Sequence, residues 1–301
     1  MMAKPSIHVA IALLFYRGKV LVGWRNAEQH QGNKHEFPGG KFEEKETPIQ
    51  ACRREVMEEV GIDLTDWHNF DFVQHDYDDL QVNLHFFHTY VDDTQLATIV
   101  EPWTWFKREE LDGLNFPKAN QDIVNRLVLP QHIKITTDLS DIVQLAENTL
   151  LYWRMQLKVH ELETALSALP NEQLAKIMLN VVQWQQLSKD LQQRIGFIHF
   201  KQNQLIEYQS KDRPQGVICI AACHDLSSLQ QAQQIGVDAA ILSPVQATNT
   251  HPDVQPLGWT QFSEFTKAID IPVYALGGMK PSDLEQIQQH QGYGVAGISN
   301  F

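Results

Sequence analysis

The feature that most restricts the fold of this sequence is a series of short apolar runs in its C-terminal half. Eight runs typical of β-strands alternate with helical stretches such as 227–235 and 281–289. Strands that alternate with helices form a parallel sheet, and eight such units predict a closed (β/α)8 barrel. An open doubly wound sheet is the alternative. The eight runs are 133–136, 151–155, 177–182, 195–200, 217–222, 239–243, 272–276 and 294–298.

The N-terminal half has a different pattern, which predicts a mixed α/β domain. A helix is expected over 48–60, because Thr47 and Gln50 form a capping box, Pro48 suits the first helical position and Gly61 suits the end. A second helix is expected over 119–127. Pro130 then indicates a boundary, so we predict domains 1–130 and 131–301. The strand candidates are 9–15, 19–24, 70–75, 82–91 and 103–106.

Charge and composition exclude several classes of partner. The formal net charge is −13, which disfavours stable binding to a nucleic-acid backbone, because that contact needs a basic patch. The longest early apolar run, 7–16, is too short to span a bilayer, so no membrane association is expected. Three cysteines do not make a disulfide framework. We therefore expect a cytoplasmic protein.

The helix over 48–60 carries the chemistry. Its spacing places Glu55, Glu58 and Glu59 on one face, where three carboxylates repel one another. A solvated acidic face is the simplest interpretation of such a helix. However, Arg54 can pair with Glu46 across the preceding loop, and the glycine pair 39–40 can offer a backbone carbonyl. A hard cation with oxygen ligands, Mg²⁺ or alternatively Mn²⁺, would relieve the repulsion and bring in a polyphosphate.

This stretch resembles the Nudix box, GX₅EX₇REUXEEXGU with U aliphatic, at every fixed position from Gly40 to Ile62. The resemblance implies a Nudix hydrolase with an α/β/α sandwich around a mixed sheet. It also implies that Arg54 and Glu46 orient the catalytic helix and that Glu55 or Glu58 acts as metal ligand or base for the attacking water. The implied metal ligands are Glu55, Glu58 and Glu59, with the carbonyl of Gly39 or Gly40 as a further ligand.

The segments around this motif resemble the MutT-type 8-oxo-dGTP pyrophosphohydrolases, which cleave their substrate to a monophosphate and pyrophosphate. They are 24–26, 33–41 and 114–120. The resemblance implies that Arg25, Phe37 and Asn120 contact the oxidised purine, and an Asn amide has both the donor and the acceptor that a guanine edge requires. The alternatives are a surface Arg, a core Phe and a helix N-cap. One departure concerns a further metal-binding Glu, whose aligned position is Ile99; Glu101, two residues later, is the candidate replacement.

Residues 131–301 resemble thiamine-phosphate synthase and the TenI-like proteins, through 236–245, 256–259, 271–279 and 293–299. Glycines 277, 278 and 297 follow the last two strands, where barrels often bind phosphate, so Gly277, Gly278 and Gly297 are candidate phosphate ligands. The carboxylates and the lysine that would hold Mg-pyrophosphate are replaced, for example at 180–181, 199–204 and 248–251. We therefore expect no synthase activity, but a retained phosphate pocket.

Two functional hypotheses follow. The first is a Mg²⁺-dependent hydrolase of a nucleotide, 8-oxo-dGTP, that removes a damaged precursor from the nucleotide pool. The alternative keeps the Nudix chemistry and moves the substrate to a thiamine-related pyrophosphate. In either case, the barrel would serve as a non-catalytic phosphate sensor or as an oligomerisation module that forms a homo-oligomer.

Overall fold

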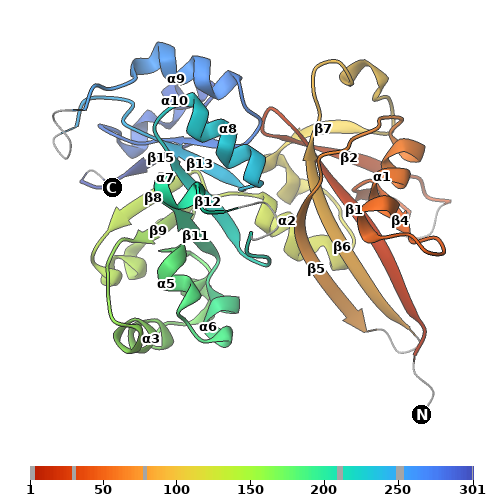
Figure 1. Ribbon diagram of the computed structural model, residues 1–301, viewed down its shortest axis with the longest axis horizontal. Helices are drawn as coiled ribbons and strands as arrows, with labels where there is room; N and C mark the ends of the chain where they lie inside the picture. Colours follow the sequence, from red (N-terminus) through yellow and green to blue (C-terminus); the bar gives the residue numbers. More distant parts are fainter. Residues whose placement is uncertain (1–3, 29–31, 77–79, 209–212, 249–253, 300) are drawn as a thin grey trace. The chain divides into compact units, whose positions relative to one another are not determined.

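The computed structural model describes residues 4–28, 32–76, 80–208, 213–248, 254–299 and 301. The chain divides into two compact units, Met1–Leu129 and Pro130–Phe301, which Figure 1 colours from red to yellow and from yellow-green to blue respectively. The division lies one residue before the boundary that Pro130 suggested. The loop positions 249–251, which the sequence comparison with thiamine-phosphate synthase used, lie outside the described residues.

The N-terminal unit is built on a mixed sheet of order β3-β2-β1-β6-β5, with β4 paired to β1 and β7 paired to β2. Strands β1 and β6 are parallel, whereas the other pairs are antiparallel. The strands are β1 (Ser6–Tyr16), β2 (Lys19–Arg25), β3 (Lys34–Glu36), β4 (Gly39–Lys41), β5 (His68–Asp76), β6 (Gln81–Tyr90) and β7 (Thr104–Lys107). The helices are α1 (Pro48–Glu59) and α2 (Gln121–Leu127), with short 3₁₀ helices at Leu96–Thr98, Arg108–Gly113 and Lys118–Asn120.

Both faces of this sheet are apolar, and one helix covers each. Successive residues of a strand point to opposite faces, so alternate residues of β1 enter two different cores. Ala10, Ala12 and Leu14 pack with Cys52 and Val56 of α1. The residues between them pack in the second core, with α2: Ile11, Leu13, Phe15, Ile123, Val124 and Leu127. The expected α/β/α sandwich is confirmed.

Helix α1 begins where the sequence predicted. The Thr47 hydroxyl accepts a hydrogen bond from the Gln50 backbone N–H, and the Gln50 side chain accepts one from the Thr47 N–H. Both bonds satisfy amides that lack partners in the first helical turn. The prediction for α2 was less accurate at its start, because Ala119 and Asn120 belong to a 3₁₀ turn before the helix. The short strands β3 and β4 were not predicted.

The C-terminal unit is a closed parallel barrel of eight strands in the order β10-β11-β12-β13-β14-β15-β8-β9. All eight predicted strands are present, and the open sheet is excluded. The strands are β8 (His132–Thr136), β9 (Thr149–Trp153), β10 (Ile177–Asn180), β11 (Phe197–Phe200), β12 (Ile218–Cys223), β13 (Ala239–Leu242), β14 (Val273–Ala275) and β15 (Gly294–Gly297).

Helices surround the barrel, as Figure 1 shows. They are α3 (Val159–Ser167), α4 (Asn171–Leu174), α5 (Val181–Gln185), α6 (Lys189–Arg194), α7 (Gln202–Leu205), α8 (Leu226–Ile235), α9 (Gly258–Lys267) and α10 (Leu284–Gln289). Several connections are short: β8 and β9 are joined through a 3₁₀ segment, Leu139–Gln144, and α4 and α7 have one turn each. These short connections and helices explain how the barrel closes with fewer than the usual ~250 residues.

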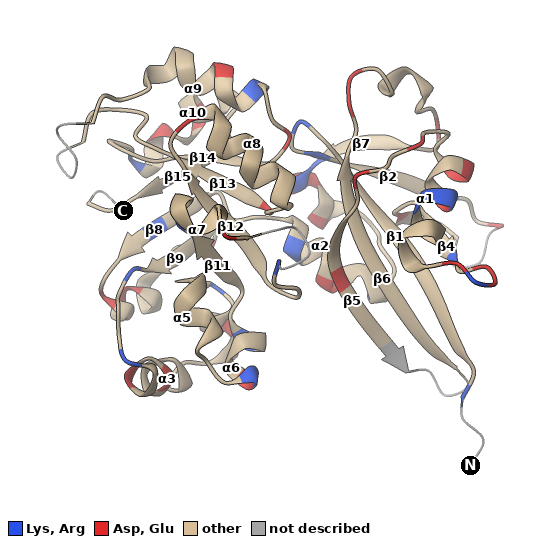
Figure 2. Ribbon diagram, in the orientation of Figure 1, with Lys and Arg blue, Asp and Glu red and all other residues tan. Residues whose placement is uncertain are grey.

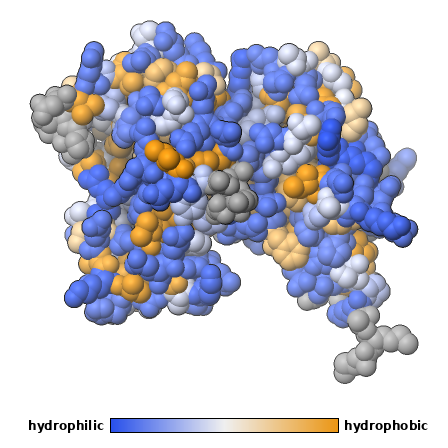
Figure 3. All heavy atoms as spheres, viewed as in Figure 1, coloured by the Kyte–Doolittle hydropathy of each residue, from blue (hydrophilic) through white to orange (hydrophobic). Residues whose placement is uncertain are grey.

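Among the described residues, no helix is long and apolar enough to cross a membrane. On the face shown in Figure 3, apolar residues are interspersed with polar ones.

Candidate active site

The acidic face of α1 is organised by one arginine. The Arg54 Nε donates to Glu46 Oε1 at 2.8 Å and its Nη2 donates to Glu46 Oε2 at 3.0 Å. Its Nη1 donates to Glu55 at 2.8 Å and to Glu58 at 3.2 Å, and Nη2 also donates to the Lys41 carbonyl at 3.0 Å. Arg54 therefore ties the loop before α1 to the helix, as the sequence predicted. Figure 2 shows the charges of both signs gathered on α1 and this loop.

The two-point contact with Arg54 lowers the pKa of Glu46 to about 2, with a further contribution from the Glu43 N–H. The same hydrogen bonds raise the pKa of Arg54. A carboxylate with so low a pKa stays ionised near neutral pH and can hold a cation in place. Glu46 thus fixes the position of the Arg54 guanidinium.

Two consecutive glycines place the backbone directly against the carboxylates. A Cβ on Gly40 would lie 2.3 Å from the Glu55 carboxylate, so no larger residue fits without displacing it. Gly39 has a φ of +153°, and a Cβ there would lie 2.2 Å from the Ala10 carbonyl. Its N–H donates to Glu59 at 2.9 Å. The glycine pair therefore lets β4 approach α1 closely, which is why it occurs before this helix.

Glu59 is the carboxyl of this group whose pKa is raised. Burial raises its pKa to about 7, and the charges of Glu36 and Glu55 add to the effect, while the Gly39 N–H and Arg25 oppose it. Glu36 was not predicted as part of this site, although it lies three residues before the glycine pair. Arg25, predicted to contact the purine, forms an ion pair with Glu36 on the neighbouring strand. Its contact with a purine stays a prediction.

The donor set fits a hard divalent cation, because it consists of carboxylates and a backbone carbonyl. In the described part of the chain, however, no three of these side chains converge as ligands. Glu55 and Glu58 are turned to Arg54, and Glu59 to the Gly39 N–H. The side chain of Glu58 is 59% exposed and can rotate toward a cation.

The predicted additional ligand, Glu101, is exposed in the turn before β7. Its loop is joined to the end of α1, because the Trp103 indole N–H donates to the Glu59 carbonyl at 2.9 Å. No contact between Glu101 and the other carboxylates is present among the described residues. Ile99 packs against the apolar core beneath α1. This position therefore supplies an apolar contact and not a negatively charged ligand.

The third predicted segment, 114–120, is fixed to β3. The His35 N–H donates to the Asn115 carbonyl at 2.8 Å, and the Asn115 N–H donates back to the His35 ring at 3.1 Å. Burial lowers the pKa of His35, which favours the neutral ring that accepts this bond. His35 is a positioning residue that the sequence comparison did not identify, although it lies inside a segment that the comparison used.

Asn120 lies at the end of this segment and is 8% exposed. Its side chain makes no cap hydrogen bond to α2, and no other partner for it is found among the described residues. The N-cap interpretation is therefore not supported by the geometry. Phe37, by contrast, is 5% exposed and stacks on Phe116 with ring centroids 4.8 Å apart. The structure places it in the core that α2 covers, so it offers a ligand little surface.

In the barrel, two adjoining cavities open at the carboxyl ends of the strands. Gly277 lines the larger one, whereas Gly278 and Gly297 are not among its lining residues. A Cβ at Gly297 would meet the Phe301 ring at 2.2 Å, so this glycine is required by packing. Of the three glycines predicted to bind phosphate, Gly277 is therefore the one found among the described lining residues of this cavity.

Comparisons with known proteins agree with this geometry. The model of the NUDIX domain matches residues 10–126, and that of thiamine monophosphate synthase matches residues 186–301. An 8-oxo-dGTP diphosphatase of Proteus vulgaris is 42% identical over 29% of this chain and 79% of its own length. One from Escherichia coli is 34% identical over 42% of this chain and 98% of its own. The chain belongs to the Nudix family, and its N-terminal unit is a Nudix hydrolase domain.

The C-terminal unit is thiamine-phosphate synthase-like. It is 39% identical to a putative thiamine-phosphate synthase of Aquifex aeolicus over 27% of this chain, and the match spans only 43% of that relative. Among solved structures, a MutT protein of Methanosarcina mazei matches 42% of this chain and 96% of its own, with 26% identity and a TM-score of 0.37.

Proposed function

We propose that the N-terminal unit hydrolyses 8-oxo-dGTP to 8-oxo-dGMP and pyrophosphate in a Mg²⁺-dependent reaction. The observation that carries the choice of substrate is Asn120, a residue only 8% exposed whose amide has no hydrogen-bond partner in the described part of the chain. A guanine edge supplies both an acceptor and a donor for such an amide. The 8-oxo-dGTP diphosphatases among the relatives support the same substrate.

Mg²⁺ would be held by Glu55, Glu58, Glu59 and the Gly39 carbonyl, where it would neutralise the polyphosphate and make a bound water more acidic. The residues of the chain do the rest. Arg54 holds the helix and the loop in register through Glu46. Glu55 or Glu58 accepts the proton of the attacking water, and Arg54, bonded to both, holds their carboxylates in position on α1.

The test is a comparison of kcat/KM for 8-oxo-dGTP, dGTP, CTP and thiamine diphosphate in the presence of Mg²⁺. CTP belongs in the panel because a CTP pyrophosphohydrolase of Escherichia coli is 34% identical over 39% of this chain. We expect 8-oxo-dGTP to have the highest value. A higher value for any other compound would overturn the proposed substrate and leave the hydrolase assignment intact.

The position of cleavage gives a second test. Attack at the β-phosphorus yields a monophosphate and pyrophosphate, so hydrolysis in ¹⁸O-water should place the label in pyrophosphate. Label found only in the monophosphate, or release of orthophosphate, would contradict this mechanism.

A thiamine-related pyrophosphate is the second candidate substrate, favoured by the thiamine-phosphate synthase-like unit in the same chain. In this alternative the barrel is a non-catalytic sensor or oligomerisation module. Greater turnover of thiamine diphosphate than of 8-oxo-dGTP would favour it, and the oligomeric state of the full chain, measured by light scattering, would test the second role.

A further inference from the structure

A pair of histidines, His8 of β1 and His85 of β6, lies on the face of the N-terminal sheet that α1 covers. Successive side chains of a strand alternate between faces, so the two histidines share a face with Ala10 and Phe87, which belong to the core beneath α1. Strands β1 and β6 are paired neighbours, as Figure 1 shows. Ala10 is fully buried, whereas His8 is exposed and His85 is half-buried. The histidine pair therefore lies at the margin of the helix-covered area, open to solvent.

The two rings present nitrogen atoms to each other at short range. His8 Nδ1 lies 3.0 Å from His85 Nε2, and the ring centroids are 5.3 Å apart. Between neutral rings, one of these nitrogens donates a proton and the other accepts it. Two nitrogens bound at ~2.0–2.1 Å to one tetrahedral ion lie about 3.3 Å apart. The observed separation is therefore close to the one that a shared metal ion requires.

Two phenylalanines fix the orientation of these rings. Phe42 contacts both histidines, with its ring centroid 5.5 Å from that of His8 and 5.1 Å from that of His85. The Phe42 N–H also donates to the His8 carbonyl at 3.1 Å. Phe72 of β5 lies against His85, with ring centroids 4.8 Å apart. Ligand rings that are already held in place lose little conformational entropy when they bind an ion.

The chemical state of the pair also suits a metal ion. Burial, and then the charge of His8, lower the pKa of His85, so its ring is neutral near neutral pH, and neutral imidazole is the form that binds metals. Both facing nitrogens become available when one ring moves its proton to its other nitrogen, so the neutral pair releases no proton. The net charge of −13 attracts cations to the chain.

We propose that His8 and His85 bind a divalent transition-metal ion of the nitrogen-preferring class, which includes Zn²⁺, Ni²⁺ and Cu²⁺. Imidazole suits these ions, whereas Mg²⁺ and Mn²⁺ prefer the oxygens of carboxylates. Within the described residues, no third histidine, cysteine or carboxylate joins the pair as a ligand, so water completes the coordination. The site is independent of the hydrolase reaction proposed for the same unit, because it uses none of the carboxylates of α1.

The test is isothermal titration calorimetry of the full chain with Zn²⁺, in excess Mg²⁺ so that the carboxylates of α1 meet a competing ion. We expect one saturable site per chain. His8→Gln and His85→Gln should each weaken it about tenfold or more, because even the loss of a partner that only orients a metal ligand costs about that much. His160→Gln is the matched control, because it removes an exposed histidine of α3, and it should leave the affinity unchanged.

Two further measurements separate this site from the carboxylates. Glu55→Gln should leave the affinity for Zn²⁺ unchanged, and replacing Zn²⁺ by Mn²⁺ should abolish binding at the pair. The electron paramagnetic resonance spectrum of bound Cu²⁺ should show coupling to two imidazole nitrogens, and His85→Gln should remove one of them.

Melting followed by circular dichroism shows that each variant is folded. Four results would each overturn the proposal. They are no saturable binding at submillimolar Zn²⁺, an unchanged affinity in folded His8→Gln or His85→Gln, a loss of affinity in Glu55→Gln equal to that in the histidine variants, and a Cu²⁺ spectrum without nitrogen coupling.

Discussion

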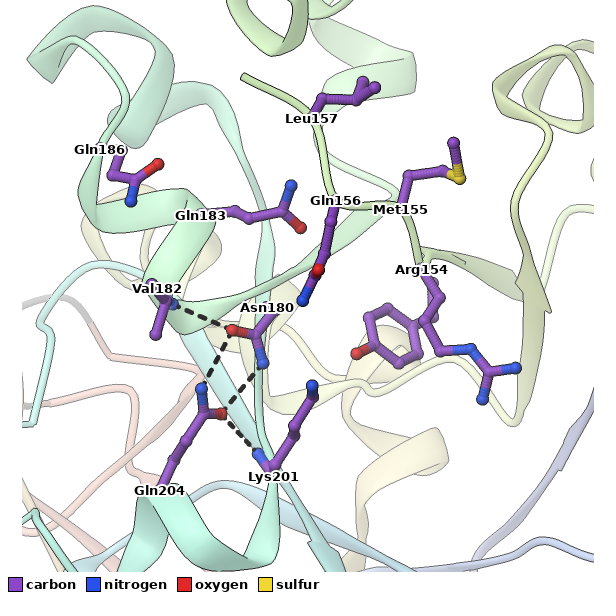
Figure 4. Close-up of a pocket in the computed structure, with 11 residues that line it drawn as sticks. Arg154, Met155, Gln156, Leu157, Asn180, Val182, Gln183, Gln186, Lys201 and Gln204 are labelled. Carbon is purple, nitrogen blue, oxygen red and sulfur yellow. Dashed lines mark hydrogen bonds between the residues drawn. The ribbon is translucent and has the colours of Figure 1, made fainter. Parts of the chain in front are cut away.

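The two units of this chain present opposite charges to a phosphate group. The N-terminal site gathers Glu55, Glu58 and Glu59 around a single compensating arginine. The barrel mouth gathers Arg154 and Lys201 (Figure 4), and the lining residues that the structure describes include no carboxylate. The first arrangement repels a polyphosphate unless a cation intervenes. The described lining of the second presents positive charge, so the two units differ in the sign of the charge that an anion would meet.

The largest effect is expected at the carboxylates. Glu55→Gln keeps the shape of the side chain and removes a charge from the face of α1. It should reduce Mg²⁺-dependent hydrolysis at least about a hundredfold, in line with the loss of a positioned base, while the fold persists. Glu109→Gln removes a charge from an exposed position and should retain full turnover. If Glu55→Gln hydrolyses its substrate at a normal rate, α1 is not the catalytic helix.

A smaller effect, in selectivity, is expected at Asn120. Asn120→Ala leaves hydrogen bonds to the oxidised base unmade, at a cost of about 1–3 kcal/mol each. The kcat/KM for 8-oxo-dGTP should therefore fall by one or more orders of magnitude, and that for dGTP should fall less. Asn125→Ala, an exposed amide on α2, is the matched control. An unchanged selectivity ratio with a lowered melting temperature would assign Asn120 a structural role and favour the thiamine-related substrate.

The sequence predicted these sites unequally, and the reasons are physical. The barrel followed from the alternation of strand and helix patterns, and α1 followed from its capping residues, because each of these signals lies within a short stretch of sequence. The Arg54–Glu46 pair was predictable from a fixed spacing within one loop and helix. The short strands β3 and β4 have three residues each and carry no period. They form by pairing with β2 and β1 respectively, and a three-residue segment gives no pattern from which such pairing can be predicted.

Contacts between separate strands and loops also explain the site contacts that were not predicted. His35 acts through Asn115, eighty residues away, so no local pattern reveals the contact. Arg25 was predicted to contact the purine, but its ion pair with Glu36 on the neighbouring strand was not predicted. The Asn180–Gln204 pair was recognised as a loss of carboxylates. In the folded barrel, Asn180 Oδ1 accepts from the Val182 N–H and Gln204 Oε1 accepts from the Lys201 N–H. These two contacts could not be predicted from the sequence.

The pH dependence of metal-free stability gives a third, smaller effect. Because the pKa of Glu59 is raised from 4.5 to about 7, the folded state binds a proton that the unfolded chain releases near pH 4.5. Its contribution to stability is full below pH 4.5 and is lost as the pH rises to about 7. In EDTA, Glu59→Gln should remove this loss, so that its melting temperature falls less than that of wild type over this interval. Parallel curves for the two proteins would show that Glu59 has no raised pKa.

The smallest effect is expected one residue before Arg54. Arg53 pairs with Asp63 at 2.5 Å, but both side chains are about half exposed, and such pairs contribute little to stability because water competes for each charge. Arg53→Gln should therefore change the melting temperature by less than about 4 °C and leave hydrolysis unchanged. Arg54→Gln removes the same formal charge, yet it unties Glu46 from Glu55 and Glu58 and should reduce hydrolysis strongly. Equal losses of activity in the two variants would mean that net charge on α1, and not the geometry around Arg54, governs the site.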